Sequence, residues 1–263
     1  MQDIYHIVEF IDTHSHLYDE AFNSEEDLAV ARALEAGVTK MILPDIDASS
    51  RYSMFRLAER HPDILYPTLG LHPTSISANW KEEMDAMENE FGKHKIWAVG
   101  EIGIDCYWSK DFLEQQKEVF RTQLEMASKA DLPVIIHSRE STELIINILK
   151  DYKKFDLRGV FHAYSGSAET FRELQKLGDW YIGIGGVLTY KKASIAETVK
   201  DIPLERIILE TDSPYLTPVP HRGKRNESSY IPHIAEKLAS QKDISIETVA
   251  ETTTQNAKRL FRL

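Results

Sequence analysis

Short apolar runs alternate with longer amphipathic segments along the chain. The runs are rich in isoleucine, valine and leucine, a composition typical of strands buried on both faces of a parallel sheet. We therefore predict a strand at each run. The runs are Ile7–Asp12, Lys40–Pro44, Ile64–Pro73, Ile96–Gly103, Leu132–Ser138, Gly159–Gly166, Trp180–Gly186 and Arg206–Pro214.

The segments between the runs have the apolar spacing and the end signals of helices. Residues 24–37 begin with Ser24 as a predicted N-cap, carry acidic side chains in the first turn and end on Gly37. Residues 167–178 repeat this pattern of an initial serine and a closing glycine. The other predicted helices are residues 111–130, Ile231–Ser240 and Ile246–Leu260.

The alternation of strands and helices predicts an α/β fold, a (β/α)8 TIM barrel that forms a single domain over residues 1–263. The length agrees, because such barrels typically take about 250 residues. An open doubly wound sheet is the alternative, but that fold usually has a glycine-rich phosphate loop after its first strand. Here the sequence "DTHSHL" (residues 12–17) occupies that place.

Composition narrows the classes of function. The net charge of −11 argues against broad binding to duplex nucleic acid, although it permits a local cationic site. The single cysteine excludes an internal disulfide framework and a cysteine-based zinc site. Neither a signal peptide nor a run long enough to span a membrane is found. We expect a cytoplasmic protein that does not bind membranes.

Potential metal ligands recur where the predicted strands end. His14 and His16 follow the first strand, and residues two apart in an extended segment point to the same side. The C-terminal ends of barrel strands converge on one face, where active sites lie. A lone buried histidine is more often a structural hydrogen-bonding residue than a ligand, but a set that shares one face favours a metal site. The other members of the set are Glu101, His137, His162 and Asp212.

One further histidine, His72, also follows a predicted strand and is expected to line the pocket or bind substrate. The donors are nitrogen and oxygen without sulfur. One carboxylate between two groups of histidines indicates a pair of metals with a shared bridge, and such pairs lie about 3.5–4 Å apart. These donors suit zinc or manganese, and also magnesium with retained waters.

At this point the chain resembles the TatD-type metal-dependent deoxyribonucleases, within the amidohydrolase-like barrel superfamily. The resemblance runs almost from end to end, and its motifs occur in the order of the family. The motifs are "DTHSHL", "GLHP", "AVGEIGID", "PVIIHSR", "FHAYSGS", "IILETDSPYL" and "PHRGKRNE".

The resemblance implies that Glu101 bridges two divalent cations. One cation would also be held by His14, His16 and Asp212, and the other by His137 and His162. It further implies hydrolysis of DNA phosphodiester bonds, with a 3′–5′ exonuclease action on single strands. Mg²⁺ would be the activator, and Zn²⁺ or Mn²⁺ would be able to replace it.

The chemistry of such a site assigns roles to its acids. Asp212 is predicted to orient the attacking water or take its proton, and the bridging Glu101 is the second catalytic residue. Asp105, which follows Glu101 by four residues, either supports a ligand imidazole or caps a loop; the sequence leaves both open.

A few cations and aromatic residues are expected near the same face. Arg139, Arg222 and Arg225 are predicted to contact phosphate groups. Tyr107 and Trp108 either stack on an unpaired base or pack locally. This modest number of cations suits an enzyme that binds single-stranded DNA ends, and we expect it to act as a monomer.

Two other functions use the same fold. The first is a metal-dependent amidohydrolase or esterase that acts on a small molecule or on an aminoacyl-tRNA ester with the same ligands. The second is a non-catalytic barrel that binds nucleic acid or a partner. The presence of every expected ligand counts against the second function.

Overall fold

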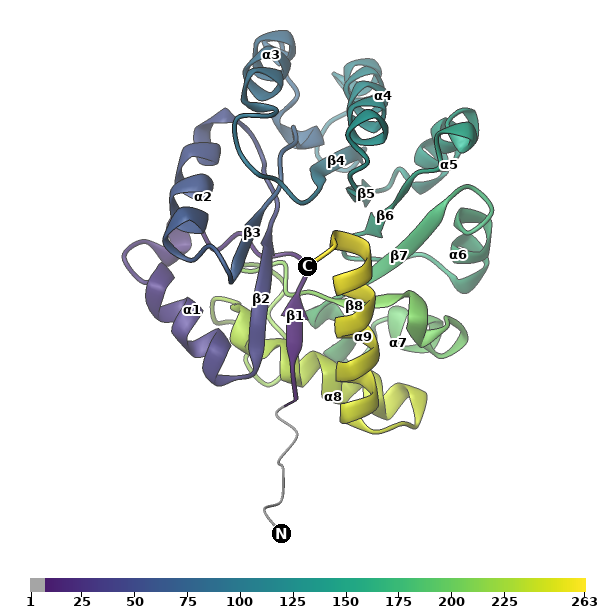
Figure 1. Ribbon diagram of the computed structural model, residues 1–263. Helices are drawn as coiled ribbons and strands as arrows, with labels where there is room; N and C mark the ends of the chain where they lie inside the picture. Colours follow the sequence, from purple (N-terminus) through teal and green to yellow (C-terminus); the bar gives the residue numbers. More distant parts are fainter. Residues whose placement is uncertain (1–7) are drawn as a thin grey trace.

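Within residues 8–263, which the computed structural model describes, eight short parallel strands line the centre of the molecule and helices surround them (Figure 1). The strands carry the apolar runs of the sequence and are buried along most of their length. They are β1 (Phe10–Asp12), β2 (Val38–Leu43), β3 (Leu65–Pro67), β4 (Val99–Asp105), β5 (Val134–Arg139), β6 (Arg158–Phe161), β7 (Asp179–Ile184) and β8 (Ile207–Leu209).

The strands form one closed barrel. β1, β2 and β3 pair in sequence order, and so do the five strands from β4 to β8, all in parallel. Isolated bridges join these two groups at both seams, between Leu69 and Val99 and between Ser15 and Ser213. The predicted single-domain (β/α)8 barrel is therefore confirmed, and the open doubly wound sheet is excluded because the sheet closes on itself.

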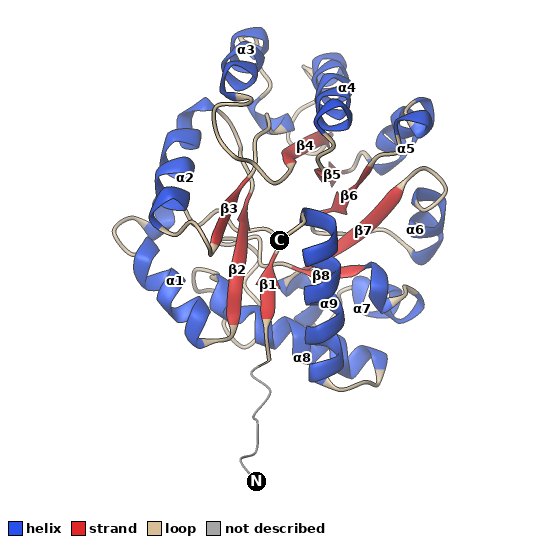
Figure 2. Cartoon of the chain, in the orientation of Figure 1, coloured by secondary structure: helices blue, strands red, loops and turns tan. Residues whose placement is uncertain are grey.

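Helices occupy the connections between successive strands and cover the outside of the barrel (Figure 2). Among residues 8–263, no helix combines the length and the apolar character needed to cross a membrane. The helices are α1 (Glu26–Glu35), α2 (Ala48–Arg60), α3 (Trp80–Glu90), α4 (Leu113–Ala130), α5 (Thr142–Asp151), α6 (Ala168–Leu174), α7 (Ile195–Thr198), α8 (Ile231–Lys242) and α9 (Ile246–Phe261).

A separate apolar cluster fills the interior of the barrel near the N-terminal ends of the strands. Each strand, or the residue just before it, contributes one side chain, and α9 packs against them across this end (Figure 1). Burial of these side chains closes one end of the barrel and leaves the other end for a site. The cluster contains Ile11, Ile42, Tyr66, Ala98, Ile135, Val160, Tyr181, Ile208, Ala257, Leu260 and Phe261.

Two of the four predicted helix-end residues are confirmed, and the closing glycine Gly178 is not, because α6 already ends at Leu174 with Gln175 as its C-cap. Gly37 follows α1 with φ +83°, a conformation that glycine adopts without strain, and the Ser167 hydroxyl accepts a hydrogen bond from Thr170 N at 3.2 Å. The predicted cap at Ser24 is wrong. Ser24 has φ 66°, and Glu25 holds the N-cap position without a side-chain hydrogen bond.

The strand bounds also differ from the prediction. Ile7 lies outside the described residues, and β3 ends at Pro67, after which Leu69 still forms an isolated bridge with Val99. β4 continues to Asp105, because Ile104 and Asp105 still pair with Ser138 and Arg139 of β5. Glu101 therefore lies inside β4 rather than at its end, and Asp212 lies three residues beyond β8.

Candidate metal centre

Four predicted ligands meet at the open end of the barrel. Nε2 of His14 lies 3.1 Å from both Nε2 of His16 and Oε2 of Glu101. Oδ1 of Asp212 lies 3.6 Å from Nε2 of His16 and 3.7 Å from Nε2 of His14. Two imidazole nitrogens and two carboxylates thus face one point, and the first three residues meet the spacing required to share a metal ion.

A second group faces the other oxygen of Glu101. Oε1 lies 2.9 Å from Nδ1 of His137 and 3.4 Å from Nε2 of His72, and these three residues also meet the spacing of a metal site. Nε2 of His162 lies 3.7 Å from the same oxygen and 3.9 Å from Oδ1 of Asp212. The carboxylate of Glu101 therefore lies between two groups of histidines.

Asp12, the last residue of β1, links the segment after β1 to the segment after β8, close to these ligands. Its carboxylate accepts hydrogen bonds from His14 N at 3.2 Å, from Thr211 N at 2.9 Å and from the Thr211 hydroxyl at 2.6 Å. Burial raises the pKa of Asp12 to about 6, although these hydrogen bonds oppose the shift. The same carboxylate thus positions the segments that carry His14 and Asp212.

Tyr18 sets the tautomer of His16. Its hydroxyl donates to the carbonyl of Pro44, so its oxygen accepts from Nδ1–H of His16 at 2.9 Å. Burial and nearby carboxylates raise the pKa of Tyr18 well above its ordinary value, which keeps the hydroxyl protonated. The lone pair of His16 is therefore on Nε2, the nitrogen that faces His14. The sequence analysis missed Tyr18, because this contact depends on the distant Pro44.

Asp105 has both of the roles that the sequence left open. Oδ2 lies 2.8 Å from Nε2 of His137, and Oδ1 accepts hydrogen bonds from the backbone of Tyr107 and Trp108 at 2.9 and 3.1 Å. Burial raises the pKa of Asp105, but the hydrogen bonds from His137 and from the backbone of Trp108 and Tyr107 together outweigh it and the pKa is lowered. An ionised carboxylate only accepts, so Nε2 of His137 carries a proton and Nδ1 is the nitrogen that faces Glu101. Burial lowers the pKa of His137, but the hydrogen bonds to Asp105 and Glu101 outweigh it and raise the pKa, so a metal ion bound at Nδ1 would replace the second ring proton.

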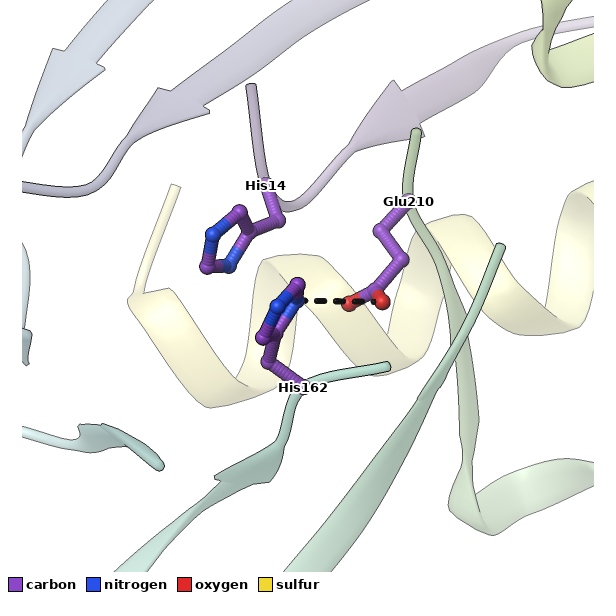
Figure 3. Close-up of side chains that lie close together, drawn as sticks. All are labelled: His14, His162 and Glu210. Atoms are coloured by element: carbon purple, nitrogen blue, oxygen red, sulfur yellow. Dashed lines mark ion pairs between the residues drawn. The ribbon is translucent and has the colours of Figure 1, made fainter. Parts of the chain in front are cut away.

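Glu210 is a buried carboxylate that the sequence analysis missed. Its Oε1 lies 3.2 Å from Nδ1 of His162 and accepts from Ala163 N at 2.6 Å (Figure 3). With His14 stacked on His162, these side chains form a third group that meets the spacing of a metal site. Glu210 precedes Asp212 by two residues, so the same-side rule that linked His14 to His16 would have found it.

The charges in the cluster suit cation binding. Burial lowers the pKa of His14 and of His72, so both rings are neutral and offer a lone pair. Burial raises the pKa of Glu101, but the surrounding histidines outweigh it and hold the pKa well below its ordinary value. Burial lowers the pKa of His162, but the surrounding carboxylates, Glu210 first, outweigh it and raise it to about 10, so this ring holds a second proton near neutral pH that a bound metal ion would displace. A buried set of imidazoles and carboxylates fits divalent metal ions.

A cavity of about 630 Å³ lies over this cluster and gives access to it. Arg139 and Trp108 line the cavity on one side, and Tyr215 and Leu216 also contribute to its walls. The guanidinium carbon of Arg139 lies 3.8 Å from the ring centroid of Tyr107 and 5.3 Å from that of Trp108. The structure thus brings Arg139 and Trp108 beside the ligands.

The other two predicted arginines do not line this cavity. Arg222 lies over the ring of Tyr190, with 4.2 Å to its centroid. Arg225 donates to Ala21 O at 2.7 Å and to Oε2 of Glu25 at 2.6 Å. The loop after β8 folds back onto the segment before α1, where Arg225 forms this ion pair.

Comparisons with known proteins agree with this geometry. Residues 11–262 match the family model described as TatD related DNase. YabD of Bacillus subtilis, described as an uncharacterized metal-dependent hydrolase, is 38% identical over 253 residues, which cover 96% of this chain and 98% of YabD. The 3′-5′ ssDNA/RNA exonuclease TatD of Pantoea ananatis is 32% identical over 248 residues, which cover 92% of this chain and 95% of that protein.

A solved structure extends the likeness to three dimensions. The crystal structure of YjjV, a TatD homolog from Escherichia coli, matches with a TM-score of 0.87 and 31% sequence identity. The match covers 98% of this chain and 99% of YjjV. The chain therefore belongs to the TatD-related DNase family of metal-dependent hydrolases, within the amidohydrolase-like superfamily.

Proposed function

We propose that this chain is a divalent-metal-dependent nuclease that hydrolyses DNA phosphodiester bonds and removes nucleotides from the 3′ ends of single strands. One observation carries the proposal. Glu101 presents Oε2 to His14 at 3.1 Å and Oε1 to His137 at 2.9 Å. A carboxylate that offers one oxygen to each of two histidine groups suits a shared bridge between two metals, an arrangement common in enzymes that cleave phosphate esters.

The cluster divides into two sites under this proposal. His14, His16 and Asp212 would hold one cation, and His137 and His162 would hold the other, with Glu101 available to both. Mg²⁺ is the proposed activator, and Zn²⁺ or Mn²⁺ fits the same donors. The pair supplies Lewis acidity that favours ionisation of water and offsets charge on the phosphate in the transition state.

Asp212 is the proposed catalytic base. Its side chain is 15% exposed and lines the cavity, so it meets both the ligands and the solvent. Burial raises the pKa of Asp212, but the surrounding histidines, His162 most of all, outweigh it and lower the pKa. The carboxylate is thus ionised near neutral pH, and it orients the attacking water and accepts its proton.

The proposed contacts to the substrate come from the walls of the cavity. Arg139 supplies a planar cation for a phosphate group, and His72 lies at the edge of the second histidine group. Trp108, 69% exposed, presents a ring on which an unpaired base stacks. Because the whole chain has a net charge of −11, binding depends on these local contacts rather than on a broad basic surface. The Pantoea ananatis relative, described as a single-strand exonuclease, supports this substrate.

The test uses the metal-reconstituted protein. Single strands labelled at either the 3′ or the 5′ end, and the matching duplex, are incubated beside a panel of amides, esters and an aminoacyl-tRNA. We expect early loss of the 3′ label and a ladder of shortened 5′-labelled products. Hydrolysis of an ester or amide without DNA cleavage would replace the nuclease by the amidohydrolase or esterase function. Tight DNA binding without any turnover would indicate a non-catalytic barrel.

A further inference from the structure

A second cavity, of about 300 Å³, lies beside the metal centre between the loops that follow β6, β7 and β8. It shares four lining residues with the larger cavity over the ligands: Ala163, Ser165, Asp212 and Leu216. The two spaces are therefore neighbours across Asp212. A substrate whose phosphate lies on the metal centre can extend directly into the second cavity.

The walls of the second cavity are largely apolar. Val187 and Leu188 line it, together with the ring of Tyr164, whose hydroxyl donates to Ser167 O at 2.7 Å and is thereby fixed. Gly183 forms part of the wall, and a Cβ added there would lie 1.9 Å from Oε2 of Glu210. The space beside Gly183 is therefore occupied by the Glu210 carboxylate, and Glu210 is itself a lining residue of the cavity.

Glu210 is a buried, charged side chain among the lining residues. Glu210 is 1% exposed, and its Oε2 finds no hydrogen-bond partner among the described residues. A buried carboxylate oxygen without a donor is costly, and an N–H group of a ligand would satisfy it. Lys192, an exposed cation, lies among the lining residues of the same cavity. The cavity thus suits a flat heterocycle with N–H groups on its edge and an anionic group nearby.

We infer that the second cavity receives the base of the 3′-terminal nucleotide while the preceding phosphodiester lies on the metal centre. The inference rests on the proposed nuclease function. The volume is at the lower limit of small-molecule pockets, roughly 300–1,000 Å³, so it accommodates one heterocycle and no continuing strand. A strand bound there must end there, and its last base must be unpaired. The cavity thereby accounts for both an exonuclease action and a preference for single strands.

The first test removes the base from the substrate. Three single strands are compared on the metal-loaded enzyme: one unmodified, one with an abasic residue at the 3′ terminus and one with it at the penultimate position. Loss of the terminal base should raise KM on the order of tenfold, the size expected for a lost base contact, and the penultimate change should matter much less. Equal kcat/KM for the unmodified and terminally abasic strands would overturn the inference.

The second test fills the cavity. Val187 and Ala193 are partly exposed lining residues of the connection after β7, so Val187→Phe and Ala193→Leu extend side chains into the space. Each should raise KM for the unmodified strand to that of the terminally abasic strand. Val219→Phe makes the same chemical change at an exposed position outside this cavity and should have no effect. A folded Val187→Phe or Ala193→Leu enzyme with unchanged KM would contradict the assignment.

A binding measurement separates this inference from the nuclease proposal. A strand ending in 2-aminopurine should lose fluorescence on binding, because the base stacks against Tyr164, and Val187→Phe should restore the signal. Quenching of this kind without cleavage of any DNA would refute the nuclease proposal and support the cavity as a base site. Cleavage without quenching of the terminal base would support the nuclease proposal and refute the base site.

Discussion

Nε2 of His137 lies 2.8 Å from Oδ2 of Asp105, so the ring turns Nδ1 rather than Nε2 toward the other ligands. The relationship fixes which nitrogen carries the proton, because the ionised carboxylate only accepts. It also ties a ligand on β5 to the end of β4, the strand that supplies Glu101. Asp105 therefore orients His137, a member of the second histidine group, without contacting the proposed cations.

Asp105→Asn should weaken binding of one of the two metal ions about 10–100-fold. The amide oxygen can still cap the backbone of Tyr107 and Trp108, but its NH₂ group then faces His137. The ring must accept at Nε2, its proton moves to Nδ1, and the lone pair toward the ligands is lost. Calorimetric metal titration measures the change, with Asp111→Asn on the same loop as the control. Unchanged affinity for both ions would refute the tautomer assignment.

Glu101→Gln should abolish turnover and reduce the bound metal below two equivalents per chain. The amide lacks the negative charge that holds two cations close together, and its nitrogen is not a ligand. Metal analysis of the dialysed protein provides the measurement, and circular dichroism checks the fold. Glu114→Gln, on an exposed side chain, is the matched control and should retain both ions. If the Glu101 variant keeps two equivalents and a normal rate, the bridge does not exist.

Asp212→Asn should retain substrate binding and lose the chemical step. The amide has nearly the same shape and keeps an oxygen toward the ligands, but it cannot accept a proton from water. General bases typically contribute 10²–10⁴-fold, so saturated turnover should fall by at least about 10²-fold. Single-turnover kinetics on a labelled single strand, at fixed metal content, separates binding from chemistry. A near-normal rate at saturation would exclude Asp212 as the base.

Arg139→Ala should weaken binding to single strands while the saturated rate changes little. Arg139 lines the cavity over the ligands, so the substitution removes a proposed contact to phosphate. Loss of one such contact should reduce the slope of log Kd against log salt by about 0.7 for a single strand. Fluorescence anisotropy at several salt concentrations gives both quantities. Arg225→Ala, at a residue held by Glu25, should leave the slope unchanged. Equal slopes for wild type and the Arg139 variant would rule out this contact.

Metal removal should lower the thermal stability of the protein. The cations bind the folded cluster and not the unfolded chain, so metal at about 100 times its Kd adds roughly 2.7 kcal/mol to the free energy of unfolding. For a chain of this size that corresponds to a rise in Tm of about 5–10 °C. Calorimetry with chelator and with added Mg²⁺, Mn²⁺ or Zn²⁺ gives the shift. Glu101→Gln should show a smaller rise, and an unchanged Tm in the wild type would argue against a buried metal centre.

Local sequence patterns were sufficient to predict the barrel and the groups that meet at its mouth. Apolar runs locate the strands, and the parallel arrangement brings together histidines as distant as His14 and His162. The partners of those rings were harder to predict, because they depend on tertiary contacts. Tyr18 reaches the carbonyl of Pro44 across the barrel mouth, and Arg225 pairs with Glu25 from 200 residues away. The second cavity depends on the conformations of three loops, which no periodic pattern encodes.

The seam between β1 and β8 also determines when the chain can acquire its ions. His14 and His16 leave the ribosome early, whereas Asp212 follows only after seven further strands have been made, and Asp212 N must then donate to His14 O at 2.8 Å. A partly synthesised chain lacks Asp212, so His14 and His16 do not yet have this carboxylate beside them. Under the proposed function, loading with two ions would thus be reserved for chains whose last strand has been inserted, and a partly synthesised chain would stay inactive toward the nucleic acid around it.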